Sequence, residues 1–197
     1  MARPRITEQE AILDAAARRL AAHGVAATTV DDVALEAGVS RATVYRYSGG
    51  KDEIVRAVIA REAEQLLARL ASVVTTSPTL ERLIADLVAT AATAIAVSPV
   101  LARLSGEDVR DTLPFITIDS ASLVDAVAGA LAAMIGEAPQ FALEPAPVAL
   151  AVEEATRLVL THLTTPRRDG SRAGPDDLGA PAATMIVPLL GQPAGRA

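Results

Sequence analysis

The chain has 197 residues, 51% of them hydrophobic and 21% charged, which is enough to bury a core as one protein or as two small domains. It contains no cysteine, so disulfides and thiolate chemistry are excluded, and a reducing cytoplasm is the expected location. Its formal net charge of −6 is unusual for a protein that binds nucleic acid.

Apolar residues recur at helical spacing from the start of the chain, which predicts an all-α protein. A first helix is expected over residues 8–22, with Thr7 as its N-cap and His23-Gly24 at its end. The sequence at residues 28–31 is typical of a capping box with Thr28 as the N-cap, and it predicts a short helix to about residue 37.

A tight turn separates this short helix from the next one. Gly38 can adopt a positive φ, Val39 can fill a small core, and Ser40 can cap a helix over residues 41–47. Two short helices joined by a glycine-containing turn predict a helix-turn-helix. This motif would belong to a three-helix domain at residues 1–50.

The rest of the chain, residues 51–197, is expected to form a helical domain for ligand binding and dimerisation. Irregular segments rich in Pro, Gly or charge separate its periodic stretches. The expected helices cover residues 51–74, 79–97, 99–104, 120–135, 148–163 and 176–190.

The helix expected over residues 41–47 carries side chains suited to the major groove. Arg41 can pair with guanine, and Ala42 and Thr43 can touch a thymine methyl group. The stretch 38–51 contains no acidic residue, so a basic patch can face DNA although the whole chain is acidic. The candidates for base contacts are Ser40, Arg41, Ala42 and Thr43, and those for the DNA backbone are Tyr45, Arg46, Tyr47 and Lys51.

Further contacts with DNA are expected around this motif. The amides of the capped helix at Thr28 and Thr29 can bind a phosphate. Arg3 and Arg5 could form an arm in the minor groove, or a tail with no function. The two tyrosines have an alternative interpretation as well, in which one or both pack the small core.

The motif resembles the DNA-binding domain of the tetracycline-repressor (TetR) family. The resemblance covers residues 8–55 and rests on TTVDDVA at 28–34, AGVSRATVYRY at 37–47 and KDEI at 51–54. It implies an all-α homodimer with a variable C-terminal ligand domain, usually acting as a repressor. The family pattern has Phe or another large apolar residue where this chain has Ser48, so Ser48→Phe should stabilise the domain if the position is a vacant pocket.

The helices after residue 55 are rich in Ala, Leu, Val and Ile, which favours a pocket for a small apolar effector. The alternative is a domain that only packs and dimerises. The last two helices, 148–163 and 176–190, are expected to form a four-helix interface between two subunits. The candidates for ligand contacts are Arg103, Arg110, Phe115, Asp119 and His162.

The sequence indicates a non-enzymatic regulator that binds double-stranded operator DNA. It has no carboxylate pair or Ser-His-Asp pattern, and Gly49-Gly50-Lys51 lacks the rest of a phosphate-binding loop. His23 and His162 lie far apart, so neither a metal nor a cofactor is expected. The uncharged stretch 87–102 is shorter than the roughly 20 residues of a membrane span. The alternative function is a helical small-molecule-binding protein with a degenerate helix-turn-helix.

Overall fold

The computed structural model of the chain describes residues 7–106, 110–111, 115, 121–165, 167–171 and 173–190. The described elements are helices throughout, as the sequence predicted. They are α1 (Glu8–His23), α2 (Val30–Ala37), α3 (Arg41–Ser48), α4 (Lys51–Thr76), α5 (Leu80–Val97), α6 (Pro99–Ser105), α8 (Ala121–Gly136), α9 (Pro145–Thr164), α10 (Pro175–Ile186) and the 3₁₀ helix η2 (Val187–Leu190).

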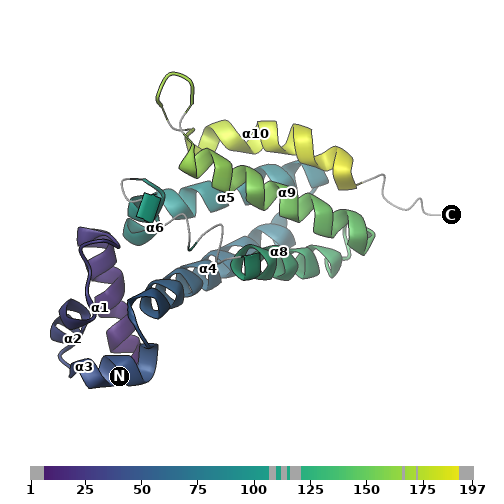
Figure 1. Ribbon diagram of the computed structural model, residues 1–197. Helices are drawn as coiled ribbons and strands as arrows, with labels where there is room; N and C mark the ends of the chain where they lie inside the picture. Colours follow the sequence, from purple (N-terminus) through teal and green to yellow (C-terminus); the bar gives the residue numbers. More distant parts are fainter. Residues whose placement is uncertain are drawn as a thin grey trace, which may run out of the picture.

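The long helix α4 connects two groups of helices (Figure 1). Helices α1, α2 and α3 lie around its N-terminal end, whereas α5 and α8 pack against the rest of it, with α10 packed on α5 and α9 on α8. Helix α6 packs against both α1 and α5, so it contacts both groups. In the described part of the chain, no helix has the length and apolar character that a membrane crossing requires.

Local capping interactions explain where the first helices begin. Thr7 is the N-cap of α1, and it forms a capping box in which its hydroxyl oxygen accepts from the Glu10 amide at 3.2 Å. The predicted N-cap Thr28 of the second helix is wrong by one residue, because Thr29 and Asp32 form that box. Thr28 is buried instead, and its hydroxyl donates to the Gly24 carbonyl at 2.7 Å.

The turn between α2 and α3 forms as predicted. Gly38 adopts a left-handed conformation with φ +70°, and its amide donates to carbonyls at the end of α2. Ser40 then caps α3, because its hydroxyl oxygen accepts from the Thr43 amide at 3.1 Å. This geometry sets the direction in which α3 leaves the small helical group.

The N-terminal helices share one hydrophobic core that extends beyond them. Ile12 and Leu20 of α1 and Val44 of α3 are fully buried in it. The same cluster includes residues from the start of α4 and from α6, namely Ile54, Val55, Val58, Ile59, Val100 and Leu104. Burial of these side chains holds α4 and α6 against the helix-turn-helix.

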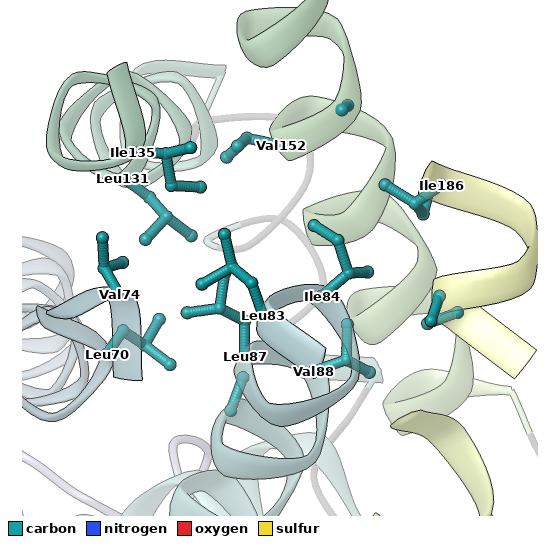
Figure 2. Packing of buried hydrophobic residues seen from close by; sticks show 14 of the residues in the cluster. Leu70, Val74, Leu83, Ile84, Leu87, Val88, Leu131, Ile135, Val152 and Ile186 are labelled. Carbon is teal, nitrogen blue, oxygen red and sulfur yellow. The ribbon is translucent and has the colours of Figure 1, made fainter. Parts of the chain in front are cut away.

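A second core fills the space between α4, α5, α8, α9 and α10 (Figure 2). Leu83 and Ile84 of α5 lie at its centre, facing Leu131 of α8 and Val152 of α9. Helix α10 approaches α5 closely, since a Cβ atom placed on Gly179 would lie 2.8 Å from the Ala85 carbonyl oxygen. Glycine is therefore required at this crossing.

Most helix boundaries in the C-terminal part lie within one or two residues of the prediction, and the start of α9 and the end of α10 differ by more. Helix α9 begins at Pro145, earlier than the predicted residue 148, because proline is well tolerated in a first helical turn. The last helix is α-helical only as far as Ile186 and continues as η2. Pro188 lies in η2 and lacks the amide that a continuing α-helix would use.

Candidate DNA-reading surface and ligand cavity

Helix α3 presents its N-terminal residues at the surface, as a groove-reading helix must. Ser40 and Ala42 are exposed, and Thr43 is half-buried. The Ser40 and Thr43 hydroxyls lie 2.8 Å apart, so each side chain holds the other in place. These residues have the short side chains that can approach base edges closely.

Arg41 is held between α2 and its own helix. Its Nη1 donates to the Asp31 carboxylate at 3.1 Å, and its guanidinium lies 5.5 Å from the centroid of the Tyr45 ring. The hydrogen bond to the Tyr45 hydroxyl, followed by the charge of Asp31, raises the pKa of Arg41 above its ordinary value. The side chain therefore stays charged in an extended position at the surface.

Arg46 has a similar arrangement on the other side of α3. Its Nη2 donates to the Glu8 carboxylate at 3.4 Å, and its guanidinium lies 4.7 Å from the Tyr47 ring centroid. Tyr45 and Tyr47 remain 45% and 42% exposed, so neither ring is part of the buried core. Both aromatic rings and both arginines are accessible from solvent.

The remaining predicted DNA contacts lie around this helix. The Lys51 ammonium group donates to the Ala26 carbonyl at 3.2 Å, which ties the start of α4 to the loop before α2. Thr29 is exposed, whereas the Thr28 side chain is buried. Ser48 is half-buried at the end of α3, and the effect of Ser48→Phe stays a prediction. Arg3 and Arg5 lie outside the described residues.

A cavity of about 160 Å³ lies inside the C-terminal helices. It is lined by α4, α5, α6, α8 and α9, and its walls are aliphatic except for Thr156 and Thr164 of α9. The hydroxyls of these threonines donate to the Val152 and Leu160 carbonyls, each at 2.8 Å. The cavity walls therefore present methyl and methylene groups.

The described residues among those predicted to contact a ligand do not line this cavity. Of the four that the structure describes, Arg110 is exposed, and Arg103 and His162 are half-buried outside the lining. Phe115 packs against the N-terminal core, with the Arg56 guanidinium 5.6 Å from its ring centroid. Asp119 lies outside the described residues. The prediction sought polar groups beside apolar segments, whereas the helices turn aliphatic faces inward.

Two buried residues belong to both the cavity wall and the N-terminal core. Ile59 of α4 and Leu104 of α6 line the cavity and also pack in the cluster that holds the helix-turn-helix. The Arg61 guanidinium adds a polar link from α4 to α1, donating to Asp14 at 2.7 Å. Neither Ile59 nor Leu104 was predicted as a site residue, although Ile59, Ala63, Leu66 and Leu70 follow a helical spacing that marks one lining face.

The last two helices leave large apolar side chains at the surface of the single chain. Leu150 of α9 is 49% exposed, Met185 of α10 is 52% exposed, and Leu189 of η2 is 38% exposed. Single exposed side chains of this size are common, and here they lie on three consecutive helical elements. A partner surface could cover them.

The chain matches two sequence families that together span most of its length. Residues 12–58 match bacterial regulatory proteins of the tetR family, and residues 81–183 match the C-terminal domain of the bacterial tetracycline repressor. No protein among those with curated descriptions matches the chain.

Several solved structures share the fold of the whole chain. The TetR family repressor AlkX from Dietzia sp. strain DQ12-45-1b, implicated in biodegradation of n-alkanes, is 22% identical with a TM-score of 0.74, covering 95% of this chain and 97% of AlkX. The R. erythropolis repressor QsdR is 21% identical with a TM-score of 0.66, covering 98% and 100%. FadR from Bacillus subtilis, in complex with stearoyl-CoA, is 20% identical with a TM-score of 0.57, covering 92% and 97%.

Proposed function

The chain belongs to the tetR family of bacterial regulatory proteins, and on this premise we propose that it binds a palindromic operator as a homodimer and is released by a small apolar ligand. In this proposal it acts in the cytoplasm as a repressor and carries out no catalysis. The observation that carries the proposal is the exposed N-terminal end of α3. Ser40, Arg41 and Ala42 are exposed there, so DNA bases can contact them.

The contacts with DNA follow from the positions of these side chains. Arg41 reads guanine, and Ala42 and Thr43 contact the thymine methyl group. Phosphates beside the groove are bound by Tyr45, Arg46, Tyr47 and Lys51. The backbone amides at the N-terminal end of α2, next to Thr29, bind a further phosphate. Thr28 contributes through the packing of the loop, since its side chain is buried.

Two copies of α3 must be held at a fixed distance to read successive major grooves. Half-sites one helical turn apart require a spacing of roughly 34–36 Å between recognition helices. We assign the dimer interface to α9 and α10, where pairing would cover Leu150, Met185 and Leu189. This four-helix arrangement places the helix-turn-helix domains away from the interface.

Ligand binding is coupled to DNA through the residues shared by cavity and core. A ligand that displaces Leu104 or Ile59 also shifts α6 and α4 against α1, and with them the recognition helix. Linkage then requires that DNA and ligand weaken each other's binding by the same factor. The n-alkane degradation context of AlkX and the stearoyl-CoA bound to FadR are consistent with an apolar effector for this chain.

The proposal is tested by selecting DNA from a random pool with the purified full chain. We expect a palindrome whose affinity falls steeply with salt, because phosphate contacts release counterions. Arg41→Ala should relax the preference at one base pair in each half-site, while Lys51→Ala should weaken all sequences similarly. If no palindrome is enriched, or if binding does not depend on salt, the alternative of a ligand-binding protein with a degenerate helix-turn-helix is favoured.

A further inference from the structure

The residues that line the cavity extend along three of the helices that form it. On α4 its lining runs from Ile59 to Leu70, on α5 from Ile84 to Ile95, and on α9 from Val152 to Thr164. Each of these stripes covers about three helical turns, or roughly 16 Å of helix axis. A space of about 160 Å³ spread over this length is narrow.

The chemistry of the walls excludes a buried polar head group. Among the described lining residues, Thr156 and Thr164 carry the side-chain hydroxyls, and both protons are donated to carbonyls of α9. A carboxylate inside the cavity would thus lose its hydration without gaining a donor, which is strongly unfavourable. A hydrocarbon has no hydrogen bonds with water to lose, and its transfer from water into an apolar cavity is favourable in free energy.

From this length, narrowness and lining, we propose that the cavity is a slot for a single extended alkyl chain with no charged group along its buried length. The inference rests on the proposed effector site and specifies its ligand chemistry. Free alkanes and the alkyl tails of longer compounds share this chemistry. The described walls contain no aromatic ring, so recognition depends on shape and dispersion contacts with flexible aliphatic side chains.

The test compares ligands that differ in one property at a time, using the full chain without DNA. Partition of n-hexane and of its compact isomer 2,2-dimethylbutane between headspace and protein solution measures shape selectivity at constant composition. We expect n-hexane to bind at least about 10-fold more tightly than its isomer and than hexanoate. Binding of n-octane should be roughly 10-fold tighter again, since each buried methylene adds favourable transfer free energy.

Substitutions within the slot provide the second arm of the test. Ala155→Leu places a larger side chain into the lining of α9 and should reduce n-octane binding about 10-fold or more. The matched control is Ala149→Leu, an exposed position on the same helix, which should change binding less than about 2-fold. If Ala155→Leu does not fold, Ala63→Leu on α4 serves the same purpose.

The possible outcomes separate the slot from the proposed regulation. Equal binding of the two hexane isomers, equal binding of hexanoate, or no effect of either slot variant overturns the inference. If n-hexane binds selectively but leaves operator affinity unchanged, the slot stands and the proposed release mechanism fails. If operator DNA binds but neither the free alkanes nor an octyl chain attached to a polar group bind, DNA recognition stands and the slot is wrong. An octyl chain that binds only when attached to a larger polar group, with that group outside, supports the slot and identifies the tail as its source.

Discussion

The Arg41 guanidinium lies 3.1 Å from the Asp31 carboxylate, so the side chain that we propose reads guanine is paired with an acid of the neighbouring helix. The two side chains are 59% and 64% exposed. An ion pair this exposed contributes little to stability, so a guanine or a phosphate can replace the carboxylate. In the proposed DNA complex, Asp31 therefore competes with DNA for Arg41.

Removing this competition should strengthen DNA binding. We expect Asp31→Asn to tighten operator binding of the dimer about 2- to 30-fold at low salt, because one pair is released in each subunit and one negative charge is lost from each DNA-facing surface. The control is Asp86→Asn, which breaks the Arg82 pair on α5 and should leave operator affinity nearly unchanged. Fluorescence anisotropy measures both variants, and weaker binding by Asp31→Asn would instead assign Asp31 to positioning Arg41.

Leu104 should transmit ligand binding to the DNA-reading domain. Leu104→Val removes about one methylene from a buried side chain, and we expect a loss of about 0.5–1.5 kcal/mol in unfolding free energy together with weaker coupling between effector and operator. Leu83→Val is the control, since Leu83 is equally buried but lies in the other core and outside the cavity lining. The readout is operator affinity with and without effector, and equal coupling in both variants would contradict a special role for Leu104.

The close crossing of α5 and α10 should leave no room for a methyl group at Gly179. Gly179→Ala should lower the unfolding free energy by about 1–3 kcal/mol, because its Cβ would meet the Ala85 carbonyl oxygen at 2.8 Å. Gly129→Ala on α8 is a matched control, since nothing lies within 4 Å of its Cβ. That control should be neutral or stabilising by up to about 1 kcal/mol, as expected for alanine in a helix. Urea denaturation of both variants checks this, and equal effects would disprove the close contact.

The cap of α2 should make stability depend on pH in the acid range. The hydrogen bond from the Thr29 hydroxyl, followed by that from the Thr29 amide, lowers the pKa of Asp32 below its ordinary value of 3.8. Because the folded pKa is the lower one, ionised Asp32 contributes stability above pH 3.8, and this contribution disappears as the pH falls through the folded pKa.

Asp32→Asn should therefore be less stable than the natural chain at pH 5–7, and the difference should shrink below about pH 4. Urea denaturation across this range measures the difference. Thr29→Val removes the hydroxyl donor and should flatten the pH dependence as well. A difference between Asp32→Asn and the natural chain that persists unchanged to pH 2 would assign the effect to packing.

The helix-turn-helix was predictable because its signals act over a few residues. The Thr7 and Ser40 caps, the Gly38 turn and the spacing of apolar residues each depend on neighbours in the chain, and the resemblance of residues 28–54 added the family. The error at Thr28 has the same local origin. Two adjacent threonines can both cap, and burial of Thr28 against the Gly24 carbonyl leaves Thr29 as the cap.

The sequence alone determined the helical class of the chain, the exposed chemistry of α3 and the apolar character of the C-terminal helices. Only the tertiary structure decided which aliphatic faces surround the cavity, that Leu104 belongs to both the N-terminal core and the cavity wall, and that Asp31 pairs with Arg41. The physical reason is the distance along the chain over which each interaction acts. Capping and helical periodicity are set by residues within one or two turns, whereas a cavity wall is formed by side chains from α4, α5, α6, α8 and α9, which meet only when the whole chain has packed.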